Sequence, residues 1–213
     1  MAIRTPKTRE DLARLLNPMR LEATPFERAV AVGAAESRTF SPAAPKSGPE
    51  FTRWLRTVES LHEGIMLLRA GWLRFYPQNL PYFLQPDLNI GLIVSSGDAF
   101  TGVTYGNPTT RNPKGSAFAR RVDENGKVAM FGQPVEDGEV DVEDAWILLY
   151  DERDGLVHLE LSRPASMAGS FVDSWSERII FPPFDLALGT FSYDEDQGEA
   201  DDEGDIGFTV TRR

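Results

Sequence analysis

Cysteine is absent from this 213-residue sequence, and histidine occurs only twice. Without cysteine the chain can form no disulfide framework, no thiolate metal site and no cysteine nucleophile. Two histidines are also too few for a histidine-rich catalytic site. A protein without cysteine suits a reducing compartment, so we expect a cytoplasmic location.

Long apolar runs are missing as well. No stretch approaches the roughly 20 apolar residues that a membrane-spanning helix needs, so we expect no membrane contact. Residues 1–10 lack the apolar core of a secretory signal peptide, and we expect none. The chain is long enough to bury its own hydrophobic core. These features predict a soluble globular protein.

Positive charge is scarce in the second half of the chain. Residues 1–120 carry 15 Lys and Arg against 10 Asp and Glu, a net charge of +5, whereas residues 121–213 carry 7 against 23, a net charge of −16. The acidic half should repel nucleic acid and attract basic partners, although acidity can also serve solubility alone.

The strongest structural pattern runs from Asp144 to Arg163. Two apolar runs flank Asp154-Gly155, a dipeptide typical of two-residue β-hairpin turns because both turn positions need φ > 0. This turn sets Asp151 opposite His158. Side chains alternate between the faces of a strand. One face is therefore predicted to join the core, and it carries Trp146, Leu148, Tyr150, Val157, Leu159 and Leu161.

Three helices are predicted before this hairpin. The first begins after Thr8 and ends at Asn17-Pro18, and the second runs from Pro25 to about Glu36. The third begins at Pro49, and its apolar stripe predicts a helix packed on its own sheet or docked on a partner. The stripe consists of Phe51, Trp54, Leu55, Val58 and Leu61.

Short strands are predicted over most of the remaining chain, with a proline-rich loop at residues 77–89 packed onto the core. The predicted strands are Ile65–Leu68, Trp72–Tyr76, Ile90–Ser95, Ala99–Tyr105, Ala117–Val122, Lys127–Phe131, Arg178–Phe181, Leu186–Tyr193 and Ile206–Arg212. N-terminal helices followed by short strands predict an α+β fold with a largely antiparallel β-sheet or sandwich. We expect a helical arm with a Pro-rich linker over residues 1–48 and a single α+β domain over residues 49–213.

The first candidate catalytic group is Asp151, His158 and Glu160, which share one face of the hairpin. An Asp–His contact fixes the imidazole tautomer, and three such side chains could hold a hard metal ion. A nuclease core with Glu-x-Lys is not matched, because Ser162 stands where Lys belongs. The alternative is an ordinary ion pair near a hairpin end, so we assign no metal and no cofactor.

The second candidate is the polar loop of residues 106–116. Arg111 and Lys114, together with backbone N–H groups, could hold a phosphate. The loop lacks the glycine spacing of a Walker A motif. The alternative interpretation is an ordinary hairpin loop.

The third candidate is an acidic segment at residues 194–205. Its eight acidic residues are Asp194, Glu195, Asp196, Glu199, Asp201, Asp202, Glu203 and Asp205. The spacing does not fit an EF-hand, because Glu199 stands where that loop needs Gly. The segment could dock a basic partner, bind divalent cations loosely, or be a solvated loop.

No catalytic group stands out, so the leading hypothesis is a non-enzymatic interaction or assembly subunit. It would bind a basic protein partner through the acidic face and the N-terminal helical arm. One alternative is a divalent-metal-dependent hydrolase or nuclease-like enzyme that uses Asp151, His158 and Glu160. Another is an acidic mimic of nucleic acid that occupies a DNA-binding protein.

Overall fold

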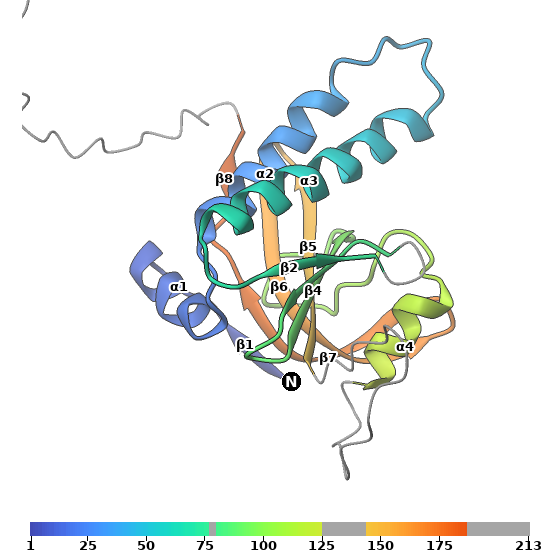
Figure 1. Cartoon of the computed structure of the whole chain (residues 1–213). Coiled ribbons are helices and arrows are strands. Elements are labelled where there is room, and N and C mark those ends of the chain that lie inside the picture. The colour runs from blue at the N-terminus through green and yellow to red at the C-terminus, as the bar shows by residue number, and fades with distance from the viewer. Residues whose placement is uncertain (77–79, 125–143, 187–213) are drawn as a thin grey trace, which may run out of the picture.

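The computed structural model describes residues 1–76, 80–124 and 144–186 (Figure 1). N-terminal helices precede most of a twisted sheet, so the predicted α+β class is confirmed. The elements in chain order are β1 (Ala2–Arg4), α1 (Arg9–Leu16), the 3-10 helix η1 (Asn17–Met19), α2 (Ala23–Ser37), α3 (Ser47–Leu67), β2 (Leu73–Phe75), β3 (Tyr82–Gln85), β4 (Ile90–Ser96), α4 (Ser116–Glu124), β5 (Asp144–Arg153), β6 (Leu156–Ala168), β7 (Phe171–Ile180) and β8 (Phe184–Asp185).

The strands form one mixed sheet in the order β1-β7-β6-β5-β4-β3-β2, with β8 paired to β6. Two neighbouring pairs are parallel, β1 with β7 and β4 with β5, and the other described pairs are antiparallel. Five of these seven described pairs are antiparallel, so the sheet is largely antiparallel as predicted, with one parallel pair inside the sheet and one at the β1 edge. The long connection from β4 to β5, which contains α4, allows these two strands to run in the same direction.

The central hairpin has the register predicted from the sequence. Asp151 pairs with His158 and Leu148 pairs with Leu161. The turn residues Asp154 and Gly155 have φ values of 53° and 77°, as a two-residue turn with two left-handed positions requires. The predicted core face of the hairpin is buried.

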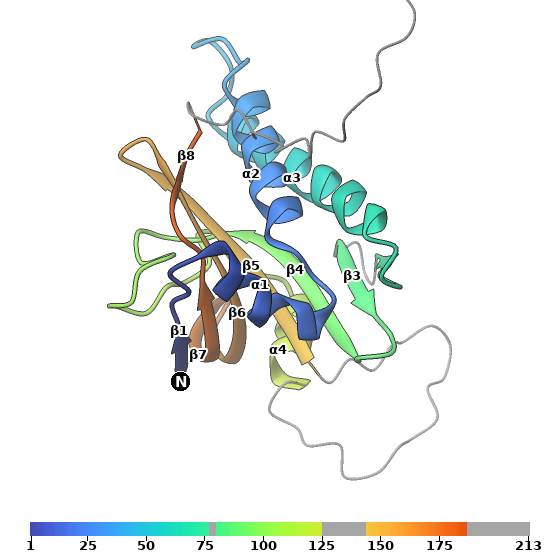
Figure 2. The ribbon, with the colours of Figure 1, turned by 90° about the vertical axis from the view of Figure 1, so that its left-hand side faces the viewer.

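Both faces of the sheet are covered, which the sequence did not predict. One face packs against α1, α2 and α3 through apolar residues such as Leu12, Phe26 and Leu61. The other face packs against α4, whose Phe118 and Val122 belong to a second core. In Figures 1 and 2 the α2–α3 pair and α4 accordingly lie on opposite sides of the sheet.

The three N-terminal helices form where the sequence places them, with shifted ends. Thr8 caps α1 by accepting a hydrogen bond from the Asp11 backbone N–H at 3.1 Å. Helix α2 begins at Ala23, two residues before the predicted Pro25. Helix α3 continues to Leu67, so the predicted strand at Ile65–Leu68 is wrong. Ile65 follows Leu61 by four residues and extends the buried side of the helix.

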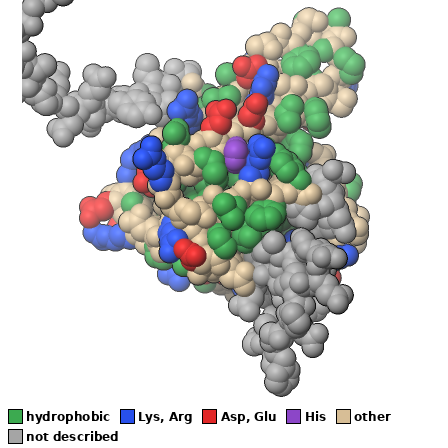
Figure 3. Space-filling model, in the orientation of Figure 1, with side chains coloured by type: hydrophobic (Ala, Val, Ile, Leu, Met, Phe, Trp, Pro, Cys, Tyr) green, Lys and Arg blue, Asp and Glu red, His purple; other side chains and the backbone are tan. Residues whose placement is uncertain are grey.

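The apolar stripe of α3 is only partly buried. Val58 and Leu61 are in the core, whereas Phe51 is 60% exposed and Leu55 is 44% exposed. In Figure 1 the loop that joins α2 to α3 projects away from the sheet. Leu67 at the end of α3 and Leu73 on β2 are also exposed, and Figure 3 shows hydrophobic side chains gathered in this view of the molecule.

Several other strand predictions are wrong. Residues 117–122 belong to the helix α4, and residues 99–105 form turns rather than a strand. Tyr82–Gln85 is a buried strand inside the predicted loop. The predictions at Lys127–Phe131 and Ile206–Arg212 lie outside the described residues, as does Leu186–Tyr193 beyond its first residue.

Among the helices of the described part of the chain, none is long and apolar enough to cross a bilayer.

Helices α2 and α3 pack closely across the predicted domain boundary at residue 48. A Cβ added at Gly33 of α2 would lie 2.2 Å from the Thr57 hydroxyl oxygen of α3. The boundary itself stays a prediction.

Candidate functional site

The hairpin residues Asp151 and His158 face each other across β5 and β6, but arginines hold the Asp151 carboxylate. Arg111 Nη2 donates to Asp151 Oδ1, and Arg153 Nη1 donates to Oδ2 at 2.9 Å. Burial lowers the pKa of His158, and the nearby Arg153 lowers it further. The arrangement therefore favours a neutral imidazole beside an ion-paired carboxylate.

Glu160, the third member of the predicted group, lies in a separate and closed cluster. Glu160 and Arg178 are both fully buried, and their side chains are joined at 3.0 Å and 2.5 Å. The Ser162 hydroxyl donates to Oε1 at 2.7 Å, and the Gly102 backbone N–H donates to Oε2 at 2.8 Å. Both carboxylate oxygens thus have two donors each, which satisfies a buried charge.

The loop after β4 seals this cluster. Arg178 Nη2 donates to the Val103 carbonyl oxygen at 3.0 Å, so the loop and the ion pair hold each other. Gly102 has φ 71°, and a Cβ there would lie 2.8 Å from the His158 Cβ. Asp151 and Glu160 therefore belong to different clusters of side chains. Within residues 1–76, 80–124 and 144–186, no three His, Asp or Glu side chains are grouped to hold a metal.

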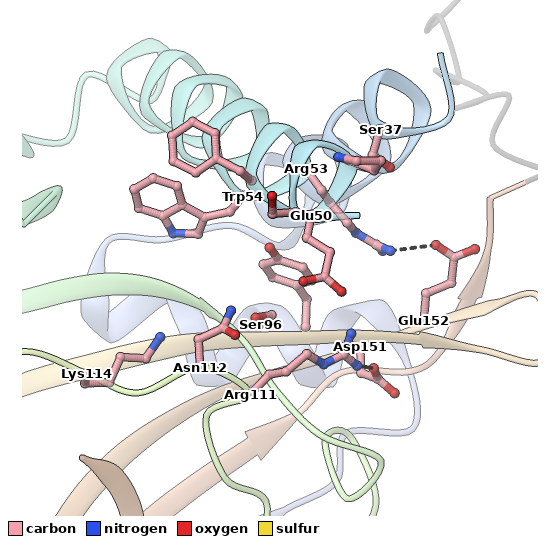
Figure 4. Close-up of a pocket in the computed structure, with 14 residues that line it drawn as sticks. Ser37, Glu50, Arg53, Trp54, Ser96, Arg111, Asn112, Lys114, Asp151 and Glu152 are labelled. Carbon is pink, nitrogen blue, oxygen red and sulfur yellow. Dashed lines mark hydrogen bonds and ion pairs between the residues drawn. The ribbon is translucent and has the colours of Figure 1, made fainter. Parts of the chain in front are cut away.

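The second predicted pair, Arg111 and Lys114, lines a pocket of about 530 Å³ (Figure 4). The pocket lies where the first turns of α3, the end of α2, the ends of β4 and β5 and the polar loop meet. Its volume suits a small organic molecule. The lining residues are Ser37, Ser47, Pro49, Glu50, Phe51, Arg53, Trp54, Ser96, Arg111, Asn112, Lys114, Tyr150, Asp151 and Glu152.

The parallel pair of strands explains why this position is open. β4 ends at Ser96, which is paired to Tyr150 near the end of β5, and the chain leaves β4 through a loop. Backbone bonds anchor this loop, from Gly97 N–H to the Tyr150 oxygen at 2.9 Å and from Arg111 N–H to the Ser96 oxygen at 2.9 Å. In open sheets, ligands commonly bind beyond the carboxyl ends of parallel strands.

Aromatic side chains form one wall of the pocket. The rings of Phe51 and Trp54 lie 5.8 Å apart, and the Trp54 indole N–H donates to the Val94 oxygen at 3.2 Å, which fixes the indole. Tyr150 is buried at the base, and burial raises the pKa of its hydroxyl to about 12. Tyr150 therefore remains a neutral phenol at physiological pH.

Most charges in the pocket are already paired. Glu152 bonds Arg53 at 2.9 Å and Arg38 at 2.5 Å, while Asp151 bonds Arg111 and Arg153. The Arg53 guanidinium also lies 5.4 Å from the centre of the Tyr150 ring. These pairs fix the charged wall of the pocket and limit the free charge that a ligand would meet.

Lys114 differs from these arginines. Its Nζ lies 5.7 Å from the centre of the Phe118 ring, and none of the described carboxylates pairs with it. Burial lowers the pKa of its ammonium group to about 8. A half-buried amine without a carboxylate partner loses its proton more readily than a solvated lysine.

Sequence reasoning identified Arg111, Lys114 and Asp151 separately but not the pocket that joins them. It placed Tyr150 simply in the core and did not single out Arg53. Phe51 is exposed in the first turns of α3. That Phe51 and Arg53 line the same pocket follows only from the position of α3 in the fold. The acidic candidates from Asp194 to Asp205 lie outside the described residues.

No family model, curated protein or solved structure matches the chain. The geometry of the described residues is therefore the basis for assigning a function.

Proposed function

We propose that the protein is a non-enzymatic binding protein whose pocket takes a small anion with a flat apolar body. The observation that carries the proposal is the uneven lining of the pocket, with aromatic side chains on one wall and arginines with Lys114 on another. A flat body would stack on Trp54, and the anionic group would face the cations.

The charge balance supports an anionic ligand. The cations that line the pocket or pair with its carboxylates are Arg38, Arg53, Arg111, Lys114 and Arg153. The carboxylates are Glu50, Asp151 and Glu152. With Lys114 protonated, this group carries two more positive than negative charges, although the whole chain has a net charge of −11. The pocket is thus locally cationic in an acidic protein, which favours anions.

Binding of 4-methylbenzoate, a flat anion, tests this proposal. Titration followed by NMR should give saturable binding with a Kd on the order of 1 mM, as expected for a fragment. The neutral isostere 4-methylbenzamide should bind several-fold more weakly. Trp54→Ala should abolish binding, whereas Tyr105→Ala, which removes an exposed aromatic residue outside the pocket lining, should leave it unchanged.

Equal binding of the acid and the amide would contradict an anion preference. Binding that survives Trp54→Ala would place the ligand elsewhere and contradict the pocket assignment. Both results are read from chemical shift changes, so they do not depend on any assumed reaction.

We also propose that the protein works as an interaction subunit in the cytoplasm, with a basic protein partner. The support is the charge division, because residues 121–213 carry a net charge of −16 against +5 in residues 1–120. Such a division favours encounter with a basic surface. Pull-down experiments at low and high salt test this role separately from the pocket.

A further inference from the structure

We propose that Lys114 captures a carbonyl compound as a reversible imine, so that the pocket holds its ligand covalently. This inference rests on the proposed pocket and names the chemical class of its ligand: a flat aromatic aldehyde with an anionic group. Lysine amines form such imines with aldehydes when they are partly desolvated and uncharged.

The position of Lys114 supports the assignment. Its side chain lines the cavity with Trp54, and Figure 4 shows it reaching from the polar loop towards the side of the pocket that carries Trp54. Its backbone N–H donates to the Ser170 oxygen at 2.7 Å, which attaches this part of the loop to the start of β7. A fixed backbone position reduces the entropic cost of placing the amine against a bound ligand.

The surrounding charges leave the amine available. Asp151 and Glu152, the two carboxylates on β5 that line the pocket, are held by arginines. Glu50 is exposed and forms no ion pair with any described residue, and its charge acts on the Tyr150 hydroxyl. No carboxylate therefore stabilises the ammonium form of Lys114, and the neutral nucleophile is within reach near neutral pH.

The reaction balances without a cofactor. The Lys114 Nζ lone pair attacks the carbonyl carbon, and proton transfer from nitrogen to oxygen gives a carbinolamine. Loss of the second amine proton and the hydroxyl group as water leaves a carbon–nitrogen double bond. No electron donor or acceptor is needed, and the addition of water reverses the step.

The chain offers a simple test, because it contains only four lysines, Lys7, Lys46, Lys114 and Lys127. The protein is incubated with 4-formylbenzoate and cyanoborohydride, which reduces an imine to a stable secondary amine. Peptide mapping by mass spectrometry then measures the rate at each lysine. We expect Lys114 to react at least tenfold faster than the exposed Lys7 and Lys46, and excess 4-methylbenzoate to slow it.

Lys114→Arg provides the matched control, since it keeps a cation and removes the nucleophile. This variant should lose the fast-forming adduct, whereas Tyr105→Ala, which lies outside the pocket lining, should keep it. If Lys114 in the wild-type protein reacts no faster than Lys7 while 4-methylbenzoate still binds, the imine proposal is overturned and the pocket proposal stands. If 4-methylbenzoate neither binds nor slows the labelling, the pocket proposal fails instead.

Discussion

Two carboxylates on the same side of the central hairpin, Asp151 and Glu160, have very different surroundings. Glu160 is fully buried and receives four donors from Arg178, Ser162 and Gly102. Asp151 lies at the edge of the pocket, where its partner Arg111 is 47% exposed. Both side chains are carboxylates on the same face of the hairpin, so the covering loop decides which carboxylate is sealed and which faces a ligand site.

One loop creates both environments. Its first part, which includes Gly102 and Val103, covers the Glu160–Arg178 pair. Its last part supplies Arg111, Asn112 and Lys114 to the pocket. The buried Glu160–Arg178 pair therefore holds the loop that shapes the pocket. We expect substitutions in this pair to weaken ligand binding in the pocket.

The largest difference in stability between the two carboxylate clusters is expected when the buried Arg178 guanidinium is removed. Arg178→Met leaves the Glu160 carboxylate buried without its cation, and we expect a loss of about 3–5 kcal/mol in unfolding free energy. Urea unfolding monitored by fluorescence measures the loss. Arg111→Met is the matched control at the open pair, where it should cost about 0–1 kcal/mol because Arg111 is partly exposed and Asp151 keeps Arg153.

A double variant separates charge burial from packing. Glu160→Gln combined with Arg178→Met removes both charges, and it should recover part of the stability lost in Arg178→Met. Equal losses for Arg178→Met and Arg111→Met would show that the two clusters do not differ in the way the structure indicates.

The hairpin that carries these two carboxylates was predictable from the sequence, because neighbouring residues determine both its turn and its register. Asp154-Gly155 specifies the turn, and the alternation of apolar residues then fixes the register. Wrong predictions arose where two periodicities competed. Phe118 and Val122 are four residues apart and both buried, which is the spacing of a helix, yet the same short run also resembles a strand.

The pocket could not be predicted because it depends on contacts between distant segments. Arg53, Arg111 and Glu152 come from a helix, a loop and a strand, and no local pattern relates them. The parallel pairing of β4 with β5, which sets the end of β4 beside Tyr150, is likewise a non-local property. The sequence identified three polar residues of the site, and only the fold brings them together.

The partly buried Lys114 amine of the pocket should change how the unfolding free energy depends on pH. Burial lowers the pKa of Lys114 in the folded protein to about 8, below its ordinary value of 10.5. Between these two pH values the unfolded chain binds more protons, so the unfolding free energy should rise with pH. After allowance for solvent screening we expect a rise on the order of 1 kcal/mol.

The measurement compares the wild-type protein with Lys114→Met in urea titrations across this pH range. Subtraction of the two curves removes the contributions of other titrating groups. A difference that grows as pH rises supports the partly desolvated amine, whereas parallel curves would mean that Lys114 is solvated in the folded protein.

The smallest effect on stability is expected for the acidic segment that the sequence singled out. Replacement of Asp194, Asp196, Asp201, Asp202 and Asp205 by Asn removes five charges from a stretch without large apolar side chains. Such changes away from a core usually alter stability by less than about 0.5 kcal/mol. We therefore expect an unchanged thermal midpoint, with the effect confined to partner binding.

The five-fold variant and the wild-type protein are compared as baits in pull-downs at low and high salt. Wild-type capture of a basic partner should weaken with salt, because exposed charges are screened beyond about 8 Å at physiological ionic strength. The variant should capture less at low salt and show little further loss at high salt. Equal capture and equal salt dependence would contradict docking through the acidic segment. A lower thermal midpoint would instead show that these carboxylates stabilise the fold. They would then resemble the buried Glu160, which stabilises the fold, rather than carboxylates that are available for binding.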